Sequence, residues 1–515
     1  MKSIKYLIPL LLMGAAVSSC DDFLDVKPVG KMIPTEVTQF ENLLNNSRTI
    51  QFTFMDNNHI SPVALQGDNL CITKVQADFY YTAQSYILEA LAAHIYYDRV
   101  VQPEVTPYYW SSGFYSQIAI FNNVIDGIEG LGVDDDYSRG VIAQARAARA
   151  WLYMYSAVCY GPMYDPNGQN DTPVLPLRTS GDPTVGNGSL ATTQQIFDQV
   201  KSDLDYACEN APEVTSTPGR ANRAAAYALR AEYNMLTRNW NAMLADARTA
   251  WDKSIANKGS ADNLFYDLKD FYYEGTAPDV GELDGPRDYM NFRGPDSDYG
   301  TAKNRENLLF REAAWGPMRT KFYLSDDFIS IFDQEHDRRW NLYALVKAAQ
   351  YTLGGQAIAD TPHRVWNKDD YTSTSHCITY PSLLLTKAEA EARTGNTSAA
   401  LADLNTLRKY RYSYEDTDLP NGASLTQDQL LEEILKERRR EQQPTAFNRT
   451  VDLKRYVFDA GKPWSKETIT HTIGDKRFSA PVSSFKLEFD NPTLRFNPQW
   501  GIEPSDAPYQ PYSKI

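Results

Sequence analysis

Two pairs of adjacent helical segments restrict this chain to folds in which helices pack against one another in pairs. Residues 220–252 carry apolar side chains at helical spacing on both sides of a break at Arg238-Asn239. Residues 381–410 repeat that arrangement around a turn at Gly395-Asn396. Each helix sets small alanines beside larger apolar residues, so that a neighbouring helix can approach closely. One such hairpin cannot bury its own apolar face, and several must therefore stack.

The same pattern extends to other parts of the chain. Further pairs of helical segments are predicted at 145–160 with 193–208 and at 426–442 with 445–458. Thr192 or Thr193 is the expected N-cap of the segment that follows it. The spacing matches the tetratricopeptide repeat of roughly 34 residues. We predict a mainly α fold with tetratricopeptide-like helical hairpins near 138–252 and 381–458, stacked around one shared core rather than in an open array.

The region between the two groups of hairpins lacks helical periodicity. Its stretch 271–300 mixes Gly, Pro, Asp and aromatic residues at a density that no helix tolerates. Loops of this length inside a compact protein are usually functional or disordered, and the aromatic residues argue against disorder. The hairpins are therefore expected to pack with a large irregular, loop-rich region, and residues near 260–380 are the predicted place of a ligand-binding site.

The start of the chain carries an export and anchoring signal. Lys2 and Lys5 give a positive beginning, residues 6–17 are apolar, and two small serines precede Cys20. This order predicts a signal peptide over residues 1–19. A cysteine directly after the small residues resembles a bacterial lipobox, so we expect acyl chains such as palmitate on Cys20 to anchor the body, residues 20–515. The alternative is a secretory signal followed by an ordinary cysteine.

The charge of the chain excludes some partners. The formal net charge of −15 falls to −17 once the leader with Lys2 and Lys5 is removed. An acidic body argues against binding to nucleic acid or to an anionic lipid surface. No later segment offers the roughly 18 apolar residues of a membrane helix, so the expected membrane link is the acyl chains on Cys20. The run KERRRE at 436–441 alternates in sign and predicts a solvated or salt-bridged helix rather than a basic ligand patch.

The reactive residue types form no recognisable catalytic or metal-binding arrangement. The histidines show no metal-ligand spacing, and no nucleophile elbow or phosphate-binding loop occurs between a strand and a helix. With 66 acidic residues, no glycosidase pair can be singled out. The run 165–171 spaces oxygen donors as a calcium loop would but lacks the closing Glu, so a turn-rich insert is favoured. We therefore expect no cofactor, no metal and no catalysis.

The cysteines beyond the leader lie far apart and form no CxxC pair, which makes a zinc or redox site a poor interpretation. An exported compartment permits a disulfide, but free buried thiols inside helices are favoured. The four residues are Cys71, Cys159, Cys208 and Cys377.

Four stretches follow one another in a characteristic order. They read CDDFLDVKP, WSSGFYSQIAIFNNVIDGIEG, ARAARAWLYMYSAVCYGPM, and LLLTKAEAEARTGNTSAALADLNTLRKYR with ILKERRREQQPTAFNRTVDLKRY. In order and spacing they resemble the SusD/RagB family of outer-membrane nutrient-binding lipoproteins of Gram-negative bacteria. The chain departs from the family pattern in GPMYDPNGQNDTPVLPL, at 443–449 and at Ala480-Pro481. These departures concern the shapes of local loops rather than the fold.

The resemblance implies a function and a partner. It implies a tetratricopeptide-based scaffold whose irregular region carries the ligand site, without catalysis. It also implies a SusC-like TonB-dependent barrel in the outer membrane, to which the lipoprotein delivers its nutrient. Asp21 and Asp22, directly after Cys20, resemble a signal for export to the cell surface. The expected location is therefore the outer membrane, lipid-anchored and facing the cell exterior.

Aromatic and polar residues of the irregular region suit a sugar ligand. Apolar sugar faces stack on aromatic rings, while sugar hydroxyls bond to Asp, Asn and Arg. The candidate ligand contacts are Tyr289, Phe292, Arg293, Trp315, Tyr108, Tyr109 and Trp110. For each of them, packing in the core is the competing interpretation. We predict capture of an oligosaccharide. A peptide ligand, a surface glycoside hydrolase and a pure tetratricopeptide adaptor that uses its concave face are the alternatives.

Overall fold

The computed structural model describes residues 34–46, 49, 55, 61–83, 87–273, 289–290, 295–312, 322–353, 355–366 and 375–515. Its helices are α3 (Val37–Leu44), α5 (Pro62–Gln66), α6 (Lys74–Ala83), α7 (Ile87–His94), α8 (Tyr108–Trp110), α9 (Ser116–Gly130), α10 (Asp136–Tyr160), α11 (Thr193–Asn210), α12 (Arg223–Leu236), α13 (Trp240–Lys258), α14 (Asp326–Ile329), α15 (Arg338–Tyr343), α16 (Tyr380–Arg393), α17 (Thr397–Arg408), α18 (Gln427–Glu441), α19 (Asn448–Tyr456) and α20 (Asn491–Phe496).

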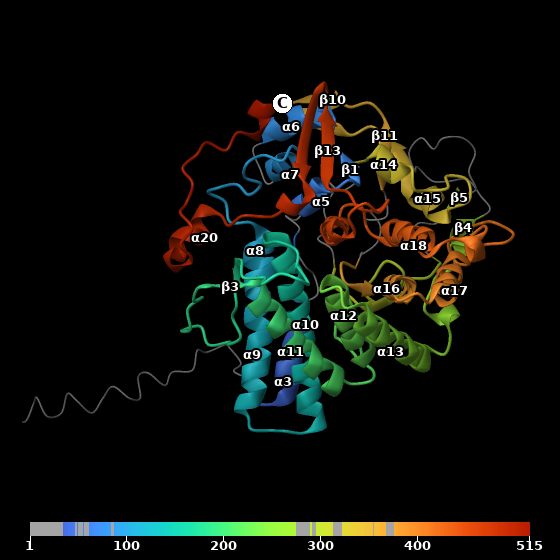
Figure 1. Cartoon of the computed structure of the whole chain (residues 1–515). Helices are drawn as coiled ribbons and strands as arrows, with labels where there is room; N and C mark the ends of the chain where they lie inside the picture. Colours follow the sequence, from blue (N-terminus) through green and yellow to red (C-terminus); the bar gives the residue numbers. More distant parts are fainter. Residues whose placement is uncertain are drawn as a thin grey trace, which may run out of the picture.

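The long helices form antiparallel pairs that stack side by side (Figure 1). Helix α10 packs on α11, α12 on α13, and α16 on α17. Contacts of α11 with α12, of α13 with α16, and of α16 with α18 join these pairs into one body. The predicted mainly α fold of tetratricopeptide-like hairpins is confirmed, and buried apolar residues from all of these pairs belong to one continuous core.

Local sequence explains where the hairpin helices begin and turn. Thr192, one of the two predicted caps, accepts a hydrogen bond from the Gln195 backbone N–H at 3.2 Å. The break inside 220–252 comes at Arg238, whose φ is +60°, and the break inside 381–410 at Gly395, whose φ is +86°. Glycine adopts this left-handed conformation without a steric penalty, so Gly395 ends one helix and lets the next fold back.

The strands are short and lie mostly in the irregular region. They are β1 (Leu70–Cys71), β2 (Pro173–Pro176), β3 (Leu190–Thr192), β4 (Tyr272–Tyr273), β5 (Tyr289–Met290), β6 (Asn307–Leu309), β7 (Tyr323–Leu324), β8 (Ala344–Lys347), β9 (Gln350–Leu353), β10 (Gln356–Ala359), β11 (His363–Trp366), β12 (Ile378–Thr379), β13 (Thr468–Ile473) and β14 (Lys476–Pro481). The largest sheet has the antiparallel order β1-β7-β11-β8. Strand β6 pairs with β12, which brings residues 307–309 beside the start of α16.

The KERRRE helix is salt-bridged and buried rather than solvated. In α18 the side chains of Arg438, Arg439 and Arg440 are all largely inaccessible to solvent. Arg438 pairs with Asp452 of α19 at 3.1 Å, and Arg440 pairs with Glu437 at 2.8 Å. Buried charges need such partners, because an unpaired ion in the interior is strongly destabilising. The helix therefore connects the last hairpin to the rest of the core.

The four cysteines beyond the leader match the predicted arrangement only in part, and the 165–171 run forms a turn. All four cysteines are free thiols, as favoured, but Cys71 lies in β1 and Cys377 precedes β12, so only Cys159 and Cys208 are inside helices. The expectation of helical placement fails for the other two, because their segments pair as strands. In the 165–171 run, Asp165 Oδ1 accepts from the Asn167 N–H at 2.9 Å, as a turn requires.

The residues that the structure describes contain neither a cluster of metal ligands nor a membrane-spanning helix. Within them, no group of three or more His, Cys, Asp or Glu is arranged to hold a metal ion. Among their helices, none combines the length and apolar character needed to cross a bilayer.

Candidate ligand-binding cleft

The structure describes only part of the predicted ligand face. Cys20, Phe292, Arg293 and Trp315 lie outside the described residues. The backbone of Tyr289 lies in β5, which pairs antiparallel with β4 so that Tyr289 is opposite Tyr273. This pairing places the backbone of Tyr289 beside Tyr273 in β4, the strand that directly follows the 268–271 turn, whose Leu268 lines a void described below.

Polar groups of the segment 295–312 meet the aromatic residues before β4. The Tyr266 hydroxyl donates to Asp296 at 3.0 Å, and the Arg305 guanidinium lies 4.2 Å from the centre of the Tyr266 ring. Burial would raise the pKa of Asp296, but hydrogen bonds from Tyr266, Arg305 and the backbone outweigh it and lower the pKa. Asp296 and Arg305 are both partly exposed, at 39% and 44% of their side chains. They form a polar, ionised surface beside an aromatic ring.

Other aromatic residues of this region belong to the core. The Tyr299 and Phe271 rings lie 4.7 Å apart in an edge-to-face arrangement, and both are buried. The Tyr299 hydroxyl shares a hydrogen bond with the hydroxyl of Tyr343. These rings brace the loop, which is the structural role that competed with ligand binding for every aromatic residue here.

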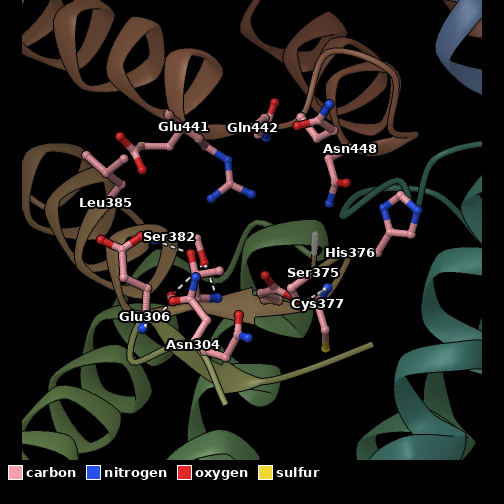
Figure 2. A pocket seen from close by; sticks show the side chains of 15 residues that line it. Asn304, Glu306, Ser375, His376, Cys377, Ser382, Leu385, Glu441, Gln442 and Asn448 are labelled. Atoms are coloured by element: carbon pink, nitrogen blue, oxygen red, sulfur yellow. Dashed lines mark hydrogen bonds between the residues drawn. The ribbon is translucent and has the colours of Figure 1, made fainter. Parts of the chain in front are cut away.

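A polar cavity lies directly behind the segment 295–312 (Figure 2). Its volume is about 80 Å³, which is enough for several water molecules, since about 10–15 Å³ of accessible volume holds one. Six elements contribute to its wall, and the lining residues are Glu232 of α12, Asn304, Glu306 and Asn307, then Ser375, His376, Cys377 and Thr379, Ser382 and Leu385 of α16, Arg438 and Glu441 of α18, Gln442 and Gln443, and Asn448 of α19.

A second, smaller void adjoins this cavity on the side of the aromatic residues. Its volume is about 20 Å³, and Tyr299, Tyr343 and Trp366 line it together with Arg339 and Arg411. The two voids share the wall residues Glu306, Glu441, Gln442 and Gln443. Together they form one cleft between the helices α16 and α18 and the irregular region, and we call it the α16–α18 cleft.

Two of the carboxylates in the cleft are already neutralised by arginines. Glu306 and Glu441 both accept from Arg411, each at 2.8 Å. Burial raises the pKa of Glu441, but the charges of Arg411 and Arg339 outweigh it and lower the pKa. Glu441 is therefore ionised at neutral pH, with its charge balanced by these guanidinium groups.

The third carboxylate, Glu232, is in a different environment. Burial raises its pKa above the ordinary value of 4.5, and the charge of Arg438 opposes that effect only in part. The Tyr155 hydroxyl donates to Glu232 Oε2 at 2.7 Å. Glu232 is thus a buried hydrogen-bonding group at the back of the cavity rather than a member of an arginine pair.

The second predicted group, Tyr108–Trp110, divides between surface and core. Tyr108 is 55% exposed, whereas Tyr109 and Trp110 are buried. The Trp110 ring lies 5.0 Å from Phe489, in the C-terminal segment. Of the three, Tyr108 alone has an exposed side chain, and packing accounts for the burial of the other two.

Tyr109 lies beside a buried acid whose titration is unusual. Burial, with Glu488 and Asp490 nearby, raises the pKa of Glu89 to about 8, while the Gln102 N–H donates to Glu89 Oε1 at 3.0 Å. Because the folded pKa lies above the unfolded value of 4.5, the stability that neutral Glu89 provides is full below pH 4.5 and is lost as the pH rises to 8. We expect Glu89→Gln, which keeps the acceptor, to raise the free energy of unfolding by roughly 1–3 kcal/mol at pH 8.

Urea denaturation at pH 5 and pH 8 checks this expectation. The difference between variant and wild type should grow with pH. Glu104→Gln is the control, because Arg495 and Asn491 lower the pKa of exposed Glu104 to about 2 and the sign of its effect is opposite. Parallel pH dependence of wild type and Glu89→Gln would contradict the expectation.

A separate surface groove of about 730 Å³ lies between residues 102–105 and 505–513. Its lining includes Tyr509, whose hydroxyl donates to the Val100 carbonyl at 2.6 Å, and Val105, which is largely exposed. One of its two segments, 102–105, comes just before Tyr108 in the sequence. None of the residues that line this groove also lines the α16–α18 cleft.

Most residues of the cleft escaped the sequence-based prediction. Arg438 and Glu441 were assigned to a structural helix, and Glu232 stood among many acids. One signal was present: the chain departs from the resembled family pattern at 443–449, the stretch that contains Gln443 and Asn448.

Comparisons with known proteins identify relatives for most of the chain. A family model described as "Starch-binding associating with outer membrane" matches residues 22–233, and a model described as "SusD family" matches residues 333–507. No curated protein sequence matches the chain.

Solved structures share the fold at low sequence identity. A SusD superfamily protein from Bacteroides vulgatus is 16% identical, with 92% of this chain and 99% of that chain covered and a TM-score of 0.62. A SusD superfamily protein from Bacteroides fragilis is 16% identical, with 91% and 99% covered and a TM-score of 0.60. A SusD-like carbohydrate binding protein from Bacteroides vulgatus is 17% identical, with 88% and 90% covered and a TM-score of 0.54.

Proposed function

This chain belongs to the SusD family, and on that premise we propose that it is a cell-surface lipoprotein that captures an oligosaccharide without catalysis. It delivers that ligand to a SusC-like TonB-dependent transporter in the outer membrane. The fold it shares with a SusD-like carbohydrate binding protein supports the choice of ligand class.

The observation that carries this proposal is the α16–α18 cleft. Carboxylate, amide and guanidinium groups converge there, and Leu268, a few residues before β4, lines its smaller void. Such groups form bidentate hydrogen bonds with sugar hydroxyls, and neighbouring aromatic rings stack on sugar faces. A peptide ligand is the alternative within the same role.

The way the cleft carboxylates are engaged argues for binding rather than hydrolysis. A glycosidase must place two carboxylates on either side of the bond between two sugar rings. Of the three carboxylates that line the cavity, Glu232 is engaged by the Tyr155 hydroxyl. Glu306 and Glu441 are in addition held by arginine.

Binding to a glycan array with a parallel hydrolysis assay tests the proposal. Saturable binding of oligosaccharides without product release supports it. Turnover without saturable binding would establish a surface glycoside hydrolase instead, and binding of peptides alone would establish the peptide alternative.

The aromatic contacts of the ligand face make a separate prediction. Tyr289→Ala or Trp315→Ala should weaken oligosaccharide binding by about 2–13-fold, because one stacking contact contributes roughly 0.5–1.5 kcal/mol beyond its buried area. The melting temperature should change little. Tyr299→Ala is the matched control, because this ring is buried and its loss should lower stability by about 3–5 kcal/mol. If both ligand-face variants melt early and the folded protein binds normally, the ligand face lies elsewhere, with Tyr108 the next candidate.

The proposed lipid anchor on Cys20 can be tested by substitution of that residue. Cys20→Ser should release the protein from membrane fractions and leave its body folded, because the acyl chains contribute nothing to the core. Fractionation of cells that lack the transporter partner measures this. Retention of the variant in the membrane fraction of those cells would show that the anchor is not on Cys20.

A further inference from the structure

Two oppositely charged side chains line the larger cavity of the α16–α18 cleft without forming an ion pair with each other. Glu232 projects from α12 and Arg438 from α18. Arg438 forms its ion pair with Asp452, and the structure has no ion pair between Arg438 and Glu232. The charge of Arg438 nevertheless acts on Glu232 and partly offsets the effect of burial. The two groups therefore face a common space rather than each other's atoms.

Glu232 and Arg438 each form hydrogen bonds with other residues through part of the side chain, and each has one polar atom that forms none. Glu232 accepts from Tyr155 through Oε2, which leaves Oε1. Arg438 donates to Asp452 through Nε and to Thr386 through Nη1, which leaves Nη2. Neither remaining atom makes a hydrogen bond to another described residue. The cavity thus offers one strong acceptor and one strong donor.

Amide groups near this pair extend the same character. Gln442 donates to Asp452 through Nε2 at 2.6 Å, while its buried Oε1 has no partner among the described residues. Figure 2 shows the Asn448 amide directed into the cavity. Glu306 and Glu441 complete the wall, with their charges balanced by Arg411.

We propose that this cavity binds a single neutral hydroxymethyl group of the glycan, which donates to Glu232 and accepts from Arg438. The inference rests on the proposed function and names the ligand class of that site: oligosaccharides of neutral hexoses rather than of uronic acids. A hydroxymethyl group fits a cavity of about 80 Å³, and a hydroxyl both donates and accepts. A carboxylate in the same place would accept from Arg438 but would be repelled by Glu232.

The test compares three forms of the best-binding hexose oligosaccharide from the array: unmodified, oxidised at C6 to the carboxylate, and 6-deoxy. Wild type should bind both modified forms at least about tenfold more weakly than the unmodified form. A hydrogen bond to a charged group is strong, and a buried charged group that loses its hydrogen-bond partner is strongly destabilised. Glu232→Gln keeps the acceptor for Tyr155. It should weaken binding of the unmodified form by about 5–10-fold and strengthen binding of the C6 carboxylate.

Two further variants separate binding from folding. Asn448→Ala removes a cavity amide that makes no hydrogen bond to a described residue, so it should weaken binding severalfold with little change in melting temperature. Glu391→Gln is the matched control, because Glu391 is buried in α16 and paired with Arg248 but does not line the cavity. It should bind as wild type does.

The outcomes are distinct. Equal affinity of wild type for the unmodified and C6-modified forms, unchanged ligand preference in folded Glu232→Gln, or unchanged affinity of folded Asn448→Ala would overturn this inference and leave the proposed function standing. Failure of wild type to bind any oligosaccharide would overturn both.

Discussion

Asp452→Ala is expected to lower the free energy of unfolding by about 3–5 kcal/mol, because it leaves the buried Arg438 guanidinium without its counter-charge and removes one of the two carboxylates, with Glu389, that pair with Arg455. Asp452 is 2% exposed. It accepts from Arg438 at 3.1 Å and from Arg455 at 2.7 Å. Burial opposes ionisation, but these two arginines outweigh it and hold the pKa of Asp452 well below its usual range. The carboxylate is therefore charged under all ordinary conditions and balances the arginines that connect α18 to α19.

Urea denaturation of the purified body measures this loss. Asp428→Ala is the control, because Asp428 pairs with Lys462 on the surface, where ion pairs contribute roughly 0–1 kcal/mol. A loss for Asp452→Ala no larger than that of the control would show that the arginines find other partners and that the network is not a structural requirement.

Lys454→Met should have a comparably large effect, for a different reason. Lys454 is 4% exposed and donates to three backbone carbonyls: Gly161 at 2.7 Å, Phe485 at 2.8 Å, and Val158. Burial lowers the pKa of its amine to about 8, so the ammonium form is retained at pH 7. Each carbonyl left buried without a donor costs about 1–3 kcal/mol, so a total loss of at least about 3 kcal/mol is expected.

Thermal and urea unfolding at pH 7 check this prediction, with Lys462→Met on the surface as the control. Lys454 joins the C-terminal end of α10, through Val158 and Gly161, to the segment around Phe485. A variant as stable as wild type would mean that water or another donor replaces the ammonium at all three carbonyls.

Sequence patterns predicted the helical hairpins because the information is local. Alanines and leucines at helical spacing, the cap at Thr192 and the turn at Gly395 act within a few residues of one another, and each is found in place. The same locality explains why KERRRE was recognised as a salt-bridged helix. Its depth in the core could not be predicted, because partners such as Asp452 and Asp68 come from other parts of the chain.

The site was less predictable because its groups come from distant segments. Glu232, Asn304 and Arg438 line one cavity only after β6 has paired with β12 and the helices have stacked. The fate of Trp110 has a similar origin, since Phe489 and Trp500 of the C-terminal segment cover it. The composition of the loops indicated residue types that bind sugars, but no spacing in the sequence shows which aromatic rings stay accessible.

An oligosaccharide bound in the α16–α18 cleft would contact the backbone of the segments that line it. Hydrogen–deuterium exchange of wild type, with and without a saturating amount of the best-binding oligosaccharide, tests binding in this cleft most directly, because bound ligand slows local opening of the backbone it contacts. We expect slower exchange in peptides that cover 295–312, 375–385 and 436–448. Protection confined to 102–108 and 505–513, the surface groove beside Tyr108, or no protection anywhere at saturation, would contradict binding in the cleft.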